Sequence, residues 1–204
     1  MAEDRRQANP DAITFNEYQE TERISTGLVG KYSINEDQFI AFNSYFRHTK
    51  WVESVPSSII HRNYNTPGFS LQYYCSTNIG QFKNSISIGA DFGWQSFDDY
   101  RHPNLGNTVE GPELLSDQFF SQSGQGIYIV DRLEINPQWS ITANLRYDRI
   151  YNKLDDNLKV DGVDLSGNAS FSKSTGKIGF AWNPRSDFGL YGNWGTGFIP
   201  PATD

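Results

Sequence analysis

The sequence contains a single cysteine, few charged residues for its length and no long apolar segment. Cys75 cannot form a disulfide framework by itself within one chain. Its neighbours Tyr74 and Ser76 belong to a strand-like run, so we expect a packed or lipid-facing thiol and no nucleophile. A transmembrane helix needs about 20 consecutive apolar residues, and no part of the sequence provides them. Helical membrane spans are therefore excluded.

The charge balance and the first residues limit the function further. The chain has 17 Lys and Arg against 24 Asp and Glu, a net charge of -7. Nucleic-acid binding needs basic patches, so we expect no nucleic-acid partner. Residues 1–10 (MAEDRRQANP) carry charge but lack the apolar core of a secretory signal peptide. The chain is either cytoplasmic or a fragment whose export signal lies upstream, and the strand pattern favours the fragment.

Aromatic residues and glycine are abundant instead. Trp, Tyr and Phe make up 15% of the chain, and there are 18 glycines. This composition is typical of β-structure and not of helices. The mean hydropathy of -0.60 does not exclude a membrane barrel, because such a barrel presents only every second residue to lipid.

Apolar and polar residues alternate with a period of two along most of the sequence, which predicts strands. The clearest run has five apolar residues on one face: Ile86, Ile88, Ala90, Phe92 and Trp94. Similar alternation covers four more segments, residues 23–32, 69–76, 138–148 and 188–198. Residues 39–46 and 127–130 are apolar on both faces, which a bulge or bulky packing inside the sheet would explain.

Short turns and long polar links alternate between these segments. The short turns are predicted at residues 34–37, 80–83, 136–138 and 183–187. The long links are predicted to be loops at residues 51–66, 98–122 and 152–170. We therefore expect an all-β fold of about eight antiparallel strands, an up-and-down segment of a transmembrane β-barrel. In outer-membrane barrels the short turns are periplasmic and the long loops extracellular.

A soluble β-barrel or sandwich would show the same alternation. Its apolar face would have to fit a closed interior, whereas here many large aromatic residues share one face and cluster towards strand ends. This distribution fits a lipid-facing surface with aromatic girdles. The opposite face contains Ser, Thr, Asn, Arg and Asp, which suits a water-filled lumen.

The last third of the chain resembles a known family. Residues 126–131 (GIYIVD) and 136–148 (NPQWSITANLRYD) resemble paired strands of TonB-dependent receptor barrels, where a Tyr-x-x-Asp strand leads into a strand ending in Leu-Arg-Tyr-Asp. The next hairpin, residues 177–184 (KIGFAWNP) and 190–201 (LYGNWGTGFIPP), resembles the family's Gly-Phe and Pro-Pro ending. The matching positions are Tyr128, Asp131, Leu145, Arg146, Tyr147, Asp148, Gly197, Phe198, Pro200 and Pro201.

The resemblance implies a partial barrel at residues 23–204, preceded by a loop or partial strand at residues 1–22, with the plug domain absent. Receptors of this family import iron–siderophore complexes, haem, cobalamin or sometimes sugars across the bacterial outer membrane. The implied partners are outer-membrane lipid, the TonB complex acting through the missing plug, and an iron–siderophore or similar small ligand. The alternative is a self-contained eight-stranded outer-membrane barrel with a structural or adhesive role, and a barrel enzyme ranks third.

The motif around Tyr147 has a structural interpretation of its own. Arg146 and Asp148 lie two residues apart on the lumen side of one strand, so they can pair with each other or with neighbouring strands. Tyr147 faces lipid near the strand end, where an amphipathic ring is favoured. Pro200 and Pro201 lack a backbone donor, so we expect them to end the strand ladder.

No catalytic constellation, metal site or cofactor motif is predicted, and we expect no enzyme activity. His48, His61 and His102 have no metal-ligand spacing. Ligand contacts are expected in the loops, because loops on a rigid scaffold usually carry binding. The candidates combine aromatic rings with positive charge: Trp51, His61, Arg62, Tyr64, Tyr100, Arg101 and His102.

Overall fold

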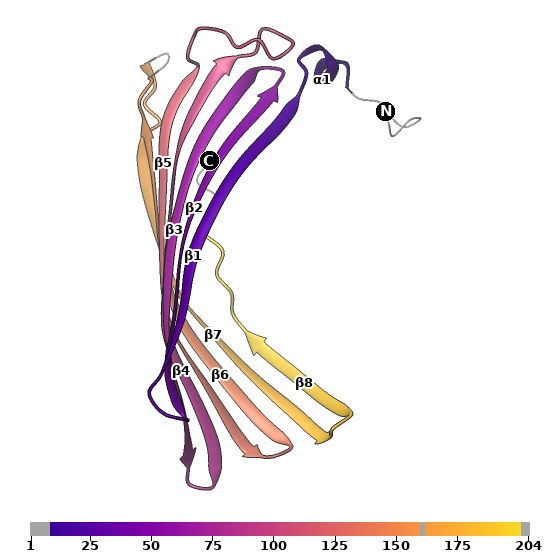
Figure 1. Cartoon of the computed structure of the whole chain (residues 1–204), viewed down its shortest axis with the longest axis vertical. Coiled ribbons are helices and arrows are strands. Elements are labelled where there is room, and N and C mark those ends of the chain that lie inside the picture. Colours follow the sequence, from indigo (N-terminus) through magenta and orange to yellow (C-terminus); the bar gives the residue numbers. More distant parts are fainter. Residues whose placement is uncertain (1–8, 160–161, 201–204) are drawn as a thin grey trace.

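The computed structural model describes residues 9–159 and 162–200, which form one antiparallel sheet of eight strands and a short helix (Figure 1). The strands pair in sequence order, as in four successive hairpins. The elements are α1 (Pro10–Thr14), β1 (Tyr18–Ser33), β2 (Gln38–Val55), β3 (Ser58–Ile79), β4 (Phe82–Pro103), β5 (Ser116–Asn136), β6 (Trp139–Asp156), β7 (Gly167–Arg185) and β8 (Phe188–Gly195).

The sheet is open. β1 pairs with β2 and β8 pairs with β7, and within the described residues the two edge strands do not meet. The expected all-β segment of about eight antiparallel strands is confirmed. Within the described residues, the eight strands do not close into a barrel. Across residues 9–159 and 162–200, no helix has the length and apolar composition needed to cross a membrane.

The two faces of the sheet differ in chemistry. One row of paired residues crosses five strands and is almost entirely apolar: Phe42, Leu71, Ala90, Ile127 and Tyr147. The adjacent row points to the opposite face and is polar or small: Asn43, Ser70, Asp91, Gly126 and Asp148. We name the first the outward face and the second the lumen face, because lipid takes the apolar side of a membrane barrel.

The sheet has almost no buried apolar interior of its own. Among the described residues, only Ile59 and Ile60 are buried hydrophobic side chains. Leu71, Ile88 and Leu145 on the outward face are between 43% and 59% exposed. A soluble fold would have to cover such a surface, so the expected lipid-facing band agrees with this burial.

The strands are much longer than the sequence predicted. The link at residues 51–66 is strand except for Pro56 and Ser57, which join β2 and β3, so the long loop predicted there is wrong. The links at residues 98–122 and 152–170 keep a loop in the middle, but the flanking strands shorten both of them at each end. β3 and β4 have 22 residues each, about twice what a tilted strand needs to cross a bilayer. Their far ends lie in water on both faces, which removes the apolar–polar alternation.

Smaller differences concern the strand ends and the irregular segments. β1 begins at Tyr18, inside the segment predicted as loop or partial strand, and α1 precedes it. The segments 39–46 and 127–130 pair without interruption, so no bulge explains them. The register shifts lie instead at the turns, between Glu134 and Asn136 and between Trp182 and Arg185.

Candidate functional site

Four of the seven predicted ligand-contacting residues come together at one end of the lumen face. Trp51 lies on β2, Arg62 and Tyr64 on β3 and Arg101 on β4, and the register aligns these strands. They are strand residues and not loop residues, which corrects the prediction. Three further residues complete the arginine–aromatic cluster, whose members are Trp51, Arg62, Tyr64, Phe97, Asp99, Arg101 and Phe120.

Asp99 is the centre of this cluster. Its carboxylate is fully buried and accepts hydrogen bonds from Arg62 Nε at 2.5 Å and from Arg101 Nε at 2.8 Å. The Arg62 side chain is 24% exposed and that of Arg101 is 39% exposed. Two guanidinium groups against one carboxylate leave one net positive charge, part of which reaches the lumen surface. A buried carboxylate with two cationic partners is satisfied and cannot serve as a free base.

Aromatic rings surround Arg62. Its guanidinium carbon lies 4.8 Å from the Trp51 ring and 5.9 Å from the Phe97 ring, both within cation–π range. The Phe97 ring stacks on Phe120 at 4.7 Å and packs against Tyr64 at 4.6 Å between ring centroids. The result is a charged group fixed between flat apolar surfaces, an arrangement that suits an anionic ligand with aromatic parts.

His61, Tyr100 and His102 lie on the outward face, away from the cluster, because each is one residue out of phase with a cluster member. Two of them bind Glu110 of the β4–β5 loop. His61 Nε2 lies 3.0 Å and His102 Nε2 3.4 Å from its carboxylate oxygens. These contacts hold the loop against the strands, so the two histidines have a local structural partner.

A second clamp fixes the same loop. Asn104 is buried and its amide donates to Ser54 Oγ at 3.0 Å and to Val55 O at 3.0 Å. The backbone N–H of Asn107 donates to Thr14 O of α1 at 3.1 Å. The loop and α1 therefore lie together at the same end of the sheet (Figure 1). By the rule of long loops and short turns, this end is extracellular.

Among the described residues of the other long loop, between β6 and β7, Lys159 and Asp164 form an ion pair. Lys159 Nζ lies 2.5 Å from Asp164 Oδ2, and the backbone N–H of Ser166 donates to Asp164 Oδ1 at 2.9 Å. The hydrogen bond from Lys159, followed by those from Ser166, lowers the pKa of Asp164 far below its ordinary value. The same bond raises the pKa of Lys159. Both groups are exposed, so the pair orders the loop with little effect on the sheet.

Three of the family-motif residues, Tyr128, Arg146 and Asp148, form a second group on the lumen face. Arg146 pairs with Asp148 at 2.8 Å and, across the sheet, with Asp91 at 2.7 Å. The pairing expected from the spacing of Arg146 and Asp148 is present, and Asp91 on β4 is a further partner across the sheet. The side chain of Arg146 lies where a β-carbon on Gly126 would be, so only glycine leaves it room. Arg146 also lies 5.7 Å from the Tyr128 ring.

The remaining motif positions lie outside the group around Arg146. Asp131 accepts a hydrogen bond from Asn84 at 2.5 Å, and Leu145 and Tyr147 point outward. Gly197, Phe198 and Pro200 lie beyond β8, while Pro201 is outside the described residues. β8 ends at Gly195, and a bond from Thr196 N to Gly176 O is the last one of its ladder. The expectation that the prolines end the ladder is therefore wrong, because it ends before them.

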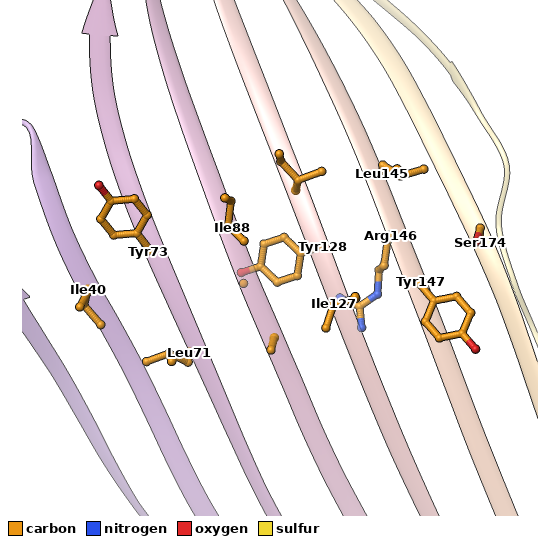
Figure 2. A pocket seen from close by; sticks show the side chains of 13 residues that line it. Ile40, Leu71, Tyr73, Ile88, Ile127, Tyr128, Leu145, Arg146, Tyr147 and Ser174 are labelled. Carbon is orange, nitrogen blue, oxygen red and sulfur yellow. The ribbon is translucent and has the colours of Figure 1, made fainter.

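The outward face carries a shallow apolar hollow of about 600 Å³ (Figure 2). It crosses the sheet from Ile40 and Leu71 to Leu145 and Tyr147. Among the residues that the structure describes, no group of three or more His, Cys, Asp or Glu side chains can hold a metal ion. The candidate sites are thus the arginine–aromatic cluster inside and this hollow outside.

Sequence reasoning missed Phe97, Asp99 and Phe120. Asp99 and Phe120 lie within residues 98–122, which the sequence predicts to be a loop, and Phe97 directly precedes that segment, so its alternation with Asp98 and Tyr100 does not stand out. Their position beside Arg62 follows only from the pairing of β3 with β4, which no local pattern specifies.

Comparison with known proteins identifies the family. The chain matches the family described as TonB dependent receptor-like, beta-barrel over residues 2–204, and it belongs to this family. The class is thus the β-barrel of a TonB-dependent receptor of the bacterial outer membrane. A comparison with curated protein sequences found no match.

Solved structures agree on the fold. The ferric citrate transporter FecA in its unliganded form is 14% identical, with a TM-score of 0.80 over 88% of this chain and 28% of that one. The ferric-catecholate import receptor Fiu from E. coli K12 is 11% identical, with a TM-score of 0.76 over 91% and 37%. The siderophore receptor PiuA from Acinetobacter baumannii is 13% identical, with a TM-score of 0.72 over 88% and 32%. The chain therefore spans about a third of the length of these receptors.

Proposed function

We propose that this chain forms part of the barrel of a receptor that imports an iron–siderophore complex, with the arginine–aromatic cluster as a contact for the ligand. The observation that carries the proposal is Arg62, held between Trp51 and Phe97 on the lumen face near the extracellular end. A ligand imported through the lumen passes this part of the barrel wall before it reaches the part of the barrel that lies within the membrane.

The charge and shape of the cluster suit such a ligand. Iron complexes of catecholates and carboxylates carry negative charge, and the cluster carries one net positive charge around the buried Asp99. The stacked rings of Tyr64, Phe97 and Phe120 offer flat apolar surfaces for aromatic ligand groups. The described similar receptors include a ferric citrate transporter and a ferric-catecholate receptor, which supports the same ligand class.

The proposal includes partners outside this chain. Energy for import would come from the TonB complex through a plug domain, and the lumen face would surround that plug. We propose a partial barrel over residues 23–204 after an N-terminal segment at residues 1–22, with β1 reaching back to Tyr18 inside that segment.

A binding titration of the full-length receptor tests the ligand contact. Ferric catecholate complexes are added while intrinsic tryptophan fluorescence is followed. Arg62→Gln is expected to weaken binding at least tenfold, because it removes a charge-assisted contact. Arg132→Gln is the matched control, since Arg132 is also on the lumen face but pairs with Glu134 at the periplasmic end. Equal affinity of parent and Arg62→Gln would contradict the proposal.

A further inference from the structure

We infer that the outward face holds one anionic lipid of the outer membrane, with its acyl chain in the apolar hollow and its phosphate at Arg149. The hollow is lined on this face by apolar side chains from five neighbouring strands, β2 to β6, among them Leu71, Ile88, Ala90, Ile127, Ile129 and Leu145. Ala90 is the smallest side chain of this set and lies between Leu71 and Ile127 in the register, which lowers the floor of the hollow.

The occupant of the hollow follows from its position. It lies within the apolar band of the outward face, and Figure 2 shows Leu71, Ile88 and Ile127 around it. Tyr128 and Arg146, also labelled there, belong to strand positions that alternate to the lumen face. On a lipid-facing surface the apolar material that fills a hollow is an acyl chain.

Arg149 lies at one rim of the hollow. It follows Tyr147 by two residues on β6, so both side chains are on the outward face, about 7 Å apart along the strand. Tyr147 lines the hollow, and Tyr151 lies on the other side of Arg149. The direction from Leu145 to Tyr151 leads out of the apolar band towards the extracellular end. Arg149 is therefore at headgroup depth, between two tyrosines of the kind that mark a membrane interface.

Among the described residues, the neighbours of Arg149 on the adjacent strands offer hydrogen bonds but no negative charge. It pairs in register with Gln125 on β5 and with Ser172 on β7. The next outward positions on the same strands are Ser123, Ser170 and Ser174. Arg149 is exposed and has no acidic partner within 4 Å among the described residues, whereas Lys153 on the same face is held by Asp155 at 2.6 Å. A cation without a counter-ion, ringed by hydroxyl and amide groups, fits a phosphate.

We assign the apolar hollow and Arg149 to one ligand because the two lie next to each other on the outward face. Tyr147, Ile127 and Ser174 line the hollow and form the row directly below Arg149. A soluble phosphate would use Arg149 without the hollow, and a neutral lipid would use the hollow without Arg149. A lipid with a phosphate-bearing anionic headgroup uses both. This site faces away from the lumen, so it does not depend on which ligand the receptor imports.

Native mass spectrometry of the full-length receptor tests the site. The protein is released from mixed micelles that contain equal amounts of phosphatidylglycerol and phosphatidylcholine, and the retained lipids are counted. The parent is expected to retain phosphatidylglycerol preferentially, and Arg149→Gln to reduce this preference about fivefold. Arg149→Lys is expected to keep most of it. Arg185→Gln is the matched control, because Arg185 lies at a periplasmic turn and is well exposed.

A second variant separates the chain-binding part from the headgroup-binding part. Ala90→Phe fills the hollow and should reduce retention of both lipids while leaving the headgroup preference of any bound lipid intact. Equal retention of both lipids by the parent would overturn the inference, as would an equal effect of Arg149→Gln and Arg185→Gln. Displacement of phosphatidylglycerol by inorganic phosphate at the same phosphate concentration would also overturn it, since that result describes an anion site without a lipid.

Discussion

The ring of Tyr128 on β5 lies directly over Gly89 on β4, in the space that a β-carbon would occupy. The same relationship recurs at other pairs that face each other across the sheet. Tyr45 covers Gly68, Phe42 covers Gly30, and Phe180 covers Gly192. A glycine in a strand interior normally weakens the strand. Here the aromatic ring of the neighbouring strand covers the exposed backbone, which also helps to hold the register.

Gly89→Ala should therefore destabilise the barrel. The added methyl group displaces Tyr128, and overpacking of this kind costs about 1–3 kcal/mol. Urea unfolding of the full-length receptor in lipid vesicles, followed by tryptophan fluorescence, measures the loss. Gly93→Ala is the control, because Gly93 is on the same strand and face but its added β-carbon meets nothing within 4 Å. Equal effects of the two variants would contradict the role of Tyr128.

Arg146→Gln should lower stability by about 1–2 kcal/mol, since it removes two ion pairs that are only partly shielded from water. Asp91 and Asp148 would then face each other across Gly126 without a cation between them. The same unfolding measurement checks this outcome. In Arg132→Gln the lost pair with Glu134 is longer, at 3.6 Å, and more exposed, so little change is expected. A larger loss in Arg132→Gln would refute this account of the lumen face.

Asp99→Asn tests the centre of the arginine–aromatic cluster. The substitution keeps the shape of the side chain but leaves Arg62 and Arg101 close together without their shared counter-ion. Removing one member of a buried ion pair costs about 3 kcal/mol, so the variant should unfold at clearly lower urea. Asp117→Asn is a suitable comparison, because Asp117 makes an exposed bond to Asn157. An unchanged unfolding midpoint for Asp99→Asn would mean that the cluster does not stabilise these strands.

Glu110→Gln should loosen the β4–β5 loop. His61 Nε2 and His102 Nε2 lie 3.0 Å and 3.4 Å from the carboxylate oxygens of Glu110, so the substitution removes the charged partner of both imidazoles. Limited proteolysis of the loop should therefore be faster in Glu110→Gln than in the parent. Equal cleavage rates would mean that Glu110 does not hold the loop against the strands.

Several features of the fold were predictable from local sequence. The alternation of Ile86, Ile88, Ala90, Phe92 and Trp94 identified the outward face, because adjacent residues of a strand point to opposite sides. The four short turns were placed correctly in outline, since Gly, Pro, Asn and Asp mark tight connections. The motif around Arg146 pointed to the family that the comparison then showed.

The sequence by itself determined the period, the two chemically distinct faces and the number of strands. Only the tertiary structure decided how far the strands extend and which residues meet across them. Above the membrane both faces of a strand contact water, so polar residues no longer alternate with apolar ones and the segment resembles a loop. Register then separated the candidate residues: Arg62 joins Asp99 inside, whereas its neighbour His61 binds Glu110 outside. Pairing between strands depends on contacts distant in sequence, which no local pattern specifies.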